Sequence, residues 1–309
     1  MRQRLPLIFV LLTMPLGSLV AQFPFPMLPT HAPLRYNPAF AGSQRGDRVI
    51  VAPSTDWLGR PEFPIGNAYV SYERNLGALH GAVAVEANFT AHQNLTRWEL
   101  AGIYSPKLSL GNRWTLAPGL RLRLRRDRLD RQREIQGVPL LDPVNNYYGE
   151  MEIGLLINSR NAHFGVSFDN LLERGLVLRD SGAFYQKSRR ITAQGGYLLA
   201  LDADNPTYFA VNGLFTYRRW DQRALLETWF RRRWLVVGAA VNSHWYFTAP
   251  QWMLMPSLGY KNDRFRLLAT YAYKLNDAVG DIPDHALELS VVYCLRLGQE
   301  NASSGAARQ

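Results

Sequence analysis

The chain has 309 residues, 47% apolar and 12% aromatic, which is enough for one large domain or two ordinary ones. Its formal net charge of +10 is carried almost wholly by arginine, a balance compatible with nucleic acid, acidic lipid or acidic protein as partners, or with charges dispersed over a surface or a polar lumen. The dispersed arrangement is the simpler interpretation, so no nucleic-acid partner is expected. A single cysteine, Cys294, excludes an internal disulfide.

The first residues look like an export signal. A basic start with Arg2 is followed by the mostly apolar stretch Leu5–Val20 and a small residue, Ala21. An N-terminal anchor helix is the alternative, but Pro15 argues against it because it interrupts a run that is already short. The pattern predicts a signal peptide over residues 1–21 and a mature chain that begins at Gln22.

A proline-rich segment, residues 22–45, comes next, and its prolines argue against both a helix and a paired strand. This segment could plug a lumen or remain in the periplasm, and we favour a partial plug. The prolines are Pro24, Pro26, Pro29, Pro33 and Pro38.

From residue 46 to residue 297 the dominant pattern has a period of two, which is typical of strands that present opposite faces to different surroundings. No stretch has a convincing helical period. The strands are expected near 46–54, 66–75, 80–89, 95–105, 112–126, 149–158, 161–169, 187–201, 206–217, 222–230, 233–242, 252–260, 265–274 and 284–296.

The links between these strands alternate between long and short. Long links are expected at 55–65, 127–148, 170–186, 243–251 and 275–283. An even number of strands with long loops at one end and short turns at the other is typical of outer-membrane barrels. A soluble β-sandwich also alternates, but it has no reason to sort its loops. The expected fold is therefore all-β: a closed antiparallel transmembrane barrel of about 14 strands in the cell outer membrane, followed by a disordered polar tail over residues 298–309.

One stretch shows the two environments most clearly. Leu120, Leu122 and Leu124 alternate with Arg121, Arg123 and Arg125. Lipid requires the leucines outside, because a charge facing hydrocarbon costs ~2–4 kcal/mol at the midplane. The arginines then belong in a wet lumen, although some could lie at the rim near lipid headgroups. Their counter-charges are expected at lumen positions Glu73, Glu86, Glu99 and Glu288.

No catalytic or metal-binding pattern stands out. The six histidines have no metal-ligand spacing. Asp284, His285 and Ser290 could be forced into a triad, but Asp284 and His285 are adjacent and point to opposite faces of a strand. We expect no enzyme, no metal and no cofactor.

Several short motifs nevertheless follow one another in a recognisable order. Tyr36–Ser43 reads YNPAFAGS, and Arg48 and Trp57 follow it. The later motifs are Leu141-Asp142-Pro143, Tyr148-Gly149, Phe164–Leu172 with the letters FGVSFDNLL, Gly195-Gly196-Tyr197, and His285 before the last strand. Together these motifs resemble the PorP/SprF family of type IX secretion system outer-membrane proteins. The chain departs from the family in three places: Pro53–Trp57, His285-Ala286 and the arginine-rich stretch Arg125–Arg133.

The resemblance implies a non-enzymatic barrel of the type IX secretion and gliding machinery, embedded in outer-membrane lipid. Its implied partners are machinery proteins, including a periplasmic peptidoglycan-associated protein, and a surface adhesin's C-terminal domain. Partner-binding residues are expected in the two family motifs, at Asn37, Pro38, Ala39, Gly42, Asp142 and Pro143. A simple turn is the other interpretation of residues 37–43. The alternative functions are a channel for hydrophobic or small solutes and a soluble periplasmic β-protein.

Overall fold

The structure is a computed structural model. It describes residues 28–44, 46–55, 66–77, 81–92, 95–129, 144–171, 176–179, 189–202, 207–218, 221–246, 249–276 and 285–296. The expected signal peptide, the polar tail and the motif residues Asp142 and Pro143 lie outside these ranges. In the described part of the chain, no helix is long and apolar enough to cross a membrane.

Almost every described residue after the N-terminal segment belongs to one 16-stranded antiparallel sheet. Its strands are β1 (Asp47–Thr55), β2 (Gly66–Gly77), β3 (Gly81–His92), β4 (Leu95–Ser105), β5 (Leu108–Leu110), β6 (Trp114–Leu129), β7 (Val144–Asn158), β8 (Ala162–Asp169), β9 (Leu176–Arg179), β10 (Arg190–Asp202), β11 (Thr207–Arg218), β12 (Asp221–Arg232), β13 (Leu235–Tyr246), β14 (Ala249–Lys261), β15 (Phe265–Lys274) and β16 (His285–Arg296).

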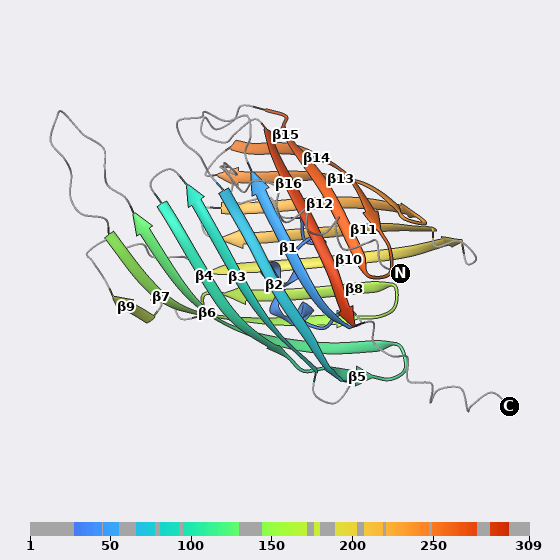
Figure 1. The fold of residues 1–309 in the computed structure, drawn as a ribbon, viewed down its shortest axis with the longest axis horizontal. Coiled ribbons are helices and arrows are strands. Elements are labelled where there is room, and N and C mark those ends of the chain that lie inside the picture. Colours follow the sequence, from blue (N-terminus) through green and yellow to red (C-terminus); the bar gives the residue numbers. More distant parts are fainter. Residues whose placement is uncertain are drawn as a thin grey trace, which may run out of the picture.

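The sheet closes on itself into a barrel (Figure 1). β1 pairs with both β2 and β16, and β6 pairs with both β4 and β7. Fourteen strands therefore form the closed wall, while β5 and β9 are short additions paired with β6 and β7. Closure satisfies the backbone groups of every wall strand, which hydrocarbon surroundings require.

All 14 expected strands are present, so the predicted fold class is confirmed. Two details of the prediction were wrong. The link expected at 243–251 shrinks to residues 247–248, because β13 and β14 both extend to pair Tyr246 with Ala249. The link expected at 170–186 contains β9, which adds to β7 through Leu176 and Val177.

The two ends of the barrel differ in their connections. At one end, here called the short-turn end, β2 and β3, β7 and β8, β12 and β13, and β14 and β15 are joined by a few residues each. The other end, here called the long-loop end, has the long connections between β6 and β7, β8 and β10, and β15 and β16. The chain enters β1 at the short-turn end, since Asp47 pairs with Arg296 there.

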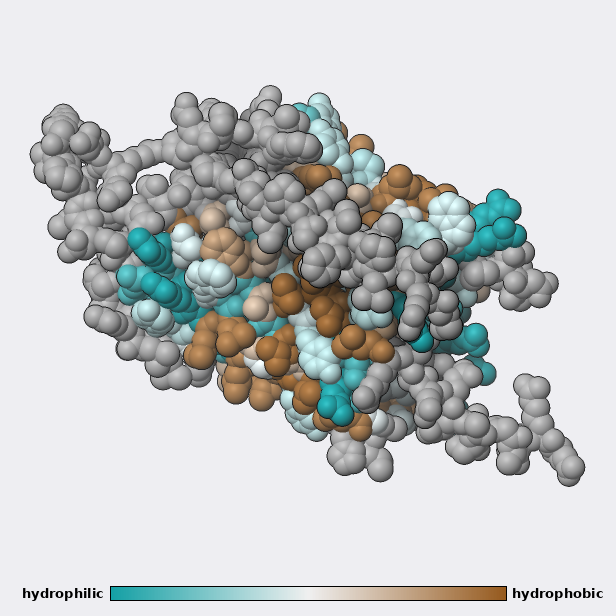
Figure 2. Space-filling model, in the orientation of Figure 1, coloured by the Kyte–Doolittle hydropathy of each residue, from teal (hydrophilic) through white to brown (hydrophobic). Residues whose placement is uncertain are grey.

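The wall has an apolar outside and a polar inside. Leu122 and Leu124 are each 58% exposed, whereas Arg121 and Arg123, which alternate with them, are 0% and 7% exposed. Figure 2 shows apolar side chains gathered over the middle of the visible wall, with hydrophilic ones nearer its left and right ends. The leucine and arginine faces of β6 thus point to lipid-like and lumen-like surroundings, respectively.

Candidate functional site

Residues 28–44, here called the plug, lie inside the barrel (Figure 1). They contain the one-turn helix α2 (Pro33–Tyr36) and the 3-10 turn η1 (Pro38–Phe40), so the expectation of no helix was wrong. Both turns have a proline in their first positions, where the missing N–H has no helical partner to lose. Fixed φ angles at these two places favour the turns instead of preventing them.

The plug is packed against inward side chains around the lumen. Leu28 and Tyr36 join a cluster with residues of β11 to β16, and Ala32 packs against residues of β1, β2 and β16. Leu34 and Ala41 pack against β3 and β4. These apolar residues are almost completely buried. The plug thus crosses the lumen and contacts most of its wall.

Asn37 and Ala39 approach a part of the wall that has no inward side chains. This glycine seat consists of Gly119 on β6, Gly154 on β7 and Gly165 on β8. A Cβ at Gly119 would lie 2.6 Å from the Ala39 Cα, and one at Gly154 would lie 3.0 Å from the Asn37 Cγ. A Cβ at Gly165 would lie 2.8 Å from the Asn37 Nδ2. At Gly119 the added carbon would meet plug backbone, and at Gly154 and Gly165 it would meet the Asn37 side chain, so the three glycines leave the room that the plug occupies.

The side chain of Asn37 joins the plug to the wall. Its Nδ2 donates to the main-chain oxygens of Leu155 and Val166, each at 3.2 Å. Its Oδ1 accepts from the Ala39 N–H at 2.9 Å, which caps η1. One buried amide therefore makes three hydrogen bonds on two strands and on the plug itself, an arrangement that alanine cannot replace.

Wall side chains also bind the plug's main chain directly. Ser105 Oγ donates to the Ala39 oxygen at 3.3 Å, and Ser167 Oγ donates to the Tyr36 oxygen at 2.7 Å. Lys107 Nζ lies 3.5 Å from the same Ala39 oxygen. Burial lowers the pKa of Lys107 to about 8, although the carboxylate of Glu73 acts in the opposite direction.

Gly42 fixes the exit of the plug toward β1. Its φ of +65° is unfavourable for other residues, and a Cβ would collide with that of Ala82. Its N–H donates to Glu73 Oε2 at 3.0 Å. Glu73 is also ion-paired with Arg48 at the start of β1. The motif glycine, the lumen carboxylate and the arginine after the motif thus form one connected group.

The other end of the plug is held by two carboxylates. His31 Nδ1 lies 2.6 Å from Glu288 Oε1, and both side chains are buried. Thr30 Oγ1 donates to Glu227 Oε2 at 3.2 Å, and Arg266 donates to the Thr30 main-chain oxygen at 2.8 Å. The plug is thus fixed at both ends by polar groups of strands that are far apart around the barrel.

Arg121 links the plug to the wall's main charge cluster. It is completely buried, forms ion pairs with Glu86 and Glu152, and donates to the main-chain oxygen of Leu34. A buried charge requires such partners, because an unpaired one is strongly destabilising. Arg121 therefore holds α2 as well as β3 and β7.

The charge cluster continues toward the long-loop end. Arg123 pairs with Glu150 at 3.0 Å, and Arg125 pairs with both Glu150 and Asp127. Arg97 pairs with Asp127 at 2.8 Å. The lumen on this side is therefore lined by paired charges.

The predicted site residues fall into three groups. Asn37, Pro38, Ala39 and Gly42 lie together in the plug, and Arg121, Arg123, Arg125, Glu73, Glu86 and Glu288 are buried in the lumen. Glu99 is half-buried and accepts a hydrogen bond from Asn88. The sequence analysis missed Glu150 and Glu152, although they alternate with outward residues on a predicted strand. It also missed His31 and Glu227, for which no local pattern exists.

This architecture defines a β-barrel of the outer-membrane type, with its own N-terminal segment seated in the lumen. The chain belongs to the family described as type IX secretion system membrane protein PorP/SprF, which it matches over residues 29–293. The match includes the plug and nearly the whole wall. No curated protein sequence matches the chain significantly.

Solved structures show the same kind of barrel at low sequence identity. A "CymD monoaromatic hydrocarbon channel" has a TM-score of 0.55 at 10% identity, over 85% of this chain and 92% of that chain. The "TodX deltaS2S3 mutant monoaromatic hydrocarbon channel" has a TM-score of 0.54 at 10% identity, over 89% of this chain and 95% of that one. "CdiB from Acinetobacter baumannii" has a TM-score of 0.44 at 11% identity, and the match covers 81% of this chain but only 60% of CdiB. At such identities the likeness shows the fold alone.

Proposed function

We propose that the protein is a non-enzymatic outer-membrane barrel of the type IX secretion and gliding machinery, which works by binding proteins. The observation that carries the proposal is the family match over residues 29–293, because it includes the plug together with the wall that holds it. The long-loop end binds the exported surface protein, such as an adhesin's C-terminal domain. The short-turn end faces the periplasm and docks the peptidoglycan-associated partner.

The plug supports a binding role over simple passage. Its main chain is held by Ser105, Ser167, Arg121 and Arg266 on four separate strands. A lumen filled in this way offers a rigid surface at the short-turn end. In this proposal the motif Asn37–Ser43 holds that surface in place, and partners bind only when the plug is packed against the glycine seat.

A channel for hydrophobic or small solutes is the second candidate, and the likeness to the CymD channel favours it. The lumen lining argues against hydrophobic solutes, because the inward positions of β6 and β7 carry paired charges such as Arg123 and Glu150. An apolar solute on that path would meet strongly hydrated groups instead of an apolar surface.

Co-purification from native membranes tests the proposal. The variant Asn37→Ala with Gly42→Val should insert into the membrane, as followed by heat-modifiable gel mobility, but should recover less of the machinery proteins. The matched control is Gly102→Val with Thr228→Ala. Both residues lie on the outward face of the wall, in β4 and β12, and a Cβ at Gly102 meets nothing within 4 Å.

Two outcomes contradict the docking role of the motif. If the variant inserts and recovers its partners at the wild-type level, residues 37–43 serve only as a turn. If it fails to insert while the control inserts, the motif is needed for folding, and the docking role loses its support.

A further inference from the structure

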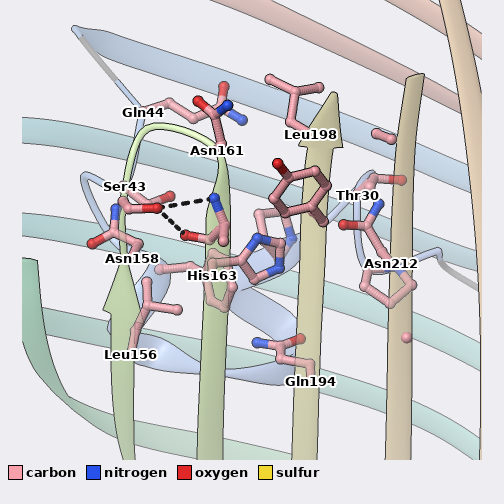
Figure 3. A pocket seen from close by; sticks show the side chains of 18 of the residues that line it. Thr30, Ser43, Gln44, Leu156, Asn158, Asn161, His163, Gln194, Leu198 and Asn212 are labelled. Atoms are coloured by element: carbon pink, nitrogen blue, oxygen red, sulfur yellow. Dashed lines mark hydrogen bonds between the residues drawn. The ribbon is translucent and has the colours of Figure 1, made fainter. Parts of the chain in front are cut away.

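A cavity of about 400 Å³ lies between the plug and the wall near the short-turn end (Figure 3). Its lining comes from the plug, from the turn between β7 and β8, and from β7, β8, β10, β11, β12 and β15. Figure 3 shows the side chains of His163, Gln194 and Asn212 gathered around one space beneath the turn that carries Asn161. Cavities of ~300–1,000 Å³ with a few convergent polar groups are typical of binding sites.

Several polar atoms of the lining are buried without a hydrogen-bond partner among the described residues. They are Asn158 Oδ1, Gln194 Nε2 and Arg266 Nε. Gln194 is only 5% exposed. Buried polar groups in native proteins nearly always have a protein or water partner, so these three atoms are available to a ligand that carries both donors and acceptors.

The charges of the lining restrict the class of this ligand. Glu227 and Arg266 both line the cavity, so either an anion or a cation would meet a like charge there, while the third charge of the lining, Arg160, is exposed on the turn between β7 and β8. The remaining polar side chains are amides, hydroxyls and the imidazole of His163, which can both donate and accept hydrogen bonds. Apolar surface from Phe40, Leu156 and Leu198 lies between them. A neutral, dipolar ligand with small side groups fits this combination best.

The same wall already binds a ligand of this kind, namely the plug. Ser167 on β8 and Arg266 on β15 hold the main-chain oxygens of Tyr36 and Thr30. His163 lies on the inward side of β8 as well, four residues before Ser167, and Gln194 pairs with Gly165 of that strand. The wall thus offers similar groups just beyond the part that the plug occupies.

We propose that this cavity binds a short extended peptide segment of a partner protein through its main chain, beside the plug. The proposal deepens the proposed function, because the partner's membership of the machinery rests on it. Peptide binding itself is a property of the cavity and is measurable on the purified chain without any machinery protein.

The test uses the full chain in detergent and a blocked tripeptide, N-acetyl-Ala-photoleucine-Ala-amide, whose central residue crosslinks under light. Saturable labelling that maps to β8, β10 or β11 is expected. Gln194→Leu removes the amide without changing its size much, and should raise the half-saturating concentration by about fivefold or more. Ala210→Leu, which places a larger side chain in the lining, should have the same effect.

Gln251→Leu is the matched control. Gln251 is a buried glutamine on β14 whose amide atoms also have no hydrogen-bond partner among the described residues, but it does not line the cavity. Heat-modifiable mobility confirms that each variant is folded. The proposal is overturned if labelling is not saturable, or if Gln194→Leu and Ala210→Leu label like the control.

A third outcome would replace the ligand class. If maltose competes with the probe while acetyl-trialanine amide does not, the cavity binds neutral sugars, and the peptide proposal is wrong. The two proposals can fail separately. Machinery proteins can co-purify with a barrel whose cavity does not bind the tripeptide, and the cavity can bind the tripeptide in a barrel that recovers no machinery proteins.

Discussion

The glycine seat predicts a large effect of a single methyl group. Gly119→Ala adds a Cβ that would lie 2.6 Å from the Ala39 Cα, at a place where both neighbours are backbone. Because the clashing atoms belong to the main chain, no flexible side chain can move aside to relieve the contact, and the plug must shift. The barrel itself should still close, because the strand pairing of β6 with β7 does not involve the added methyl group.

The size of the effect follows from the contacts around Ala39. Overpacking of a well-packed site typically costs about 1–3 kcal/mol. A shift of Ala39 also disturbs its bonds to Asn37 and Ser105, at about 1 kcal/mol each. The plug should therefore dock about 3–5 kcal/mol less favourably, which corresponds to a factor of about 10²–10⁴ in the docking equilibrium.

Hydrogen–deuterium exchange of residues 33–43, followed by mass spectrometry, measures this equilibrium through local opening. Exchange of the plug amides in Gly119→Ala should be about 10²–10⁴ times faster than in the wild type. Gly102→Ala is the control, because a Cβ at Gly102 meets nothing within 4 Å. Unchanged exchange in a folded Gly119→Ala protein would refute the reasoning, since the seat would then not hold the plug.

Three further variants test other parts of the structure. Arg121→Met leaves Glu86 and Glu152 buried without their main partner and should lower the free energy of unfolding by about 3–5 kcal/mol in urea titrations. Arg126→Met, on the exposed face, should change this free energy little, and equal effects of the two variants would contradict the charge cluster. Leu122→Arg places a charge on the lipid-facing side and should weaken folding into bilayers by about 2–4 kcal/mol, and normal folding would contradict the assigned faces. Because the folded-state pKa of Lys107 is about 8 and the ordinary value is 10.5, the folded protein binds fewer protons between these values, so stability rises with pH across this window. Lys107→Met should remove that part of the rise, and an identical pH profile would show that Lys107 does not titrate in this way.

The wall of the barrel was predictable because its physics is local. Adjacent residues of a strand face lipid and lumen in turn, so Leu122 and Arg123 already reveal the two surroundings. Glu150 and Glu152 could have been assigned by the same alternation, since both alternate with outward residues of a strand that was expected there.

The plug and its seat were not predictable in the same way. Asn37 meets Gly119, Gly154 and Gly165 only after the barrel has closed, and no short pattern in the sequence connects these residues. The prolines were misleading because they exclude a helix only in its interior, whereas Pro33 and Pro38 begin their turns. His31 and Glu288 are likewise brought together by closure alone.

The central claim is that the seated plug makes this barrel a binding protein instead of an open pore. Single-channel recording of the purified wild-type chain in planar lipid bilayers tests it most directly, with Gly119→Ala as the comparison. The account predicts no steady open-pore conductance for the wild type and frequent openings for Gly119→Ala, in which the plug is loosened. A steady conductance of the wild type, equal to that of Gly119→Ala, would contradict it and favour the channel function.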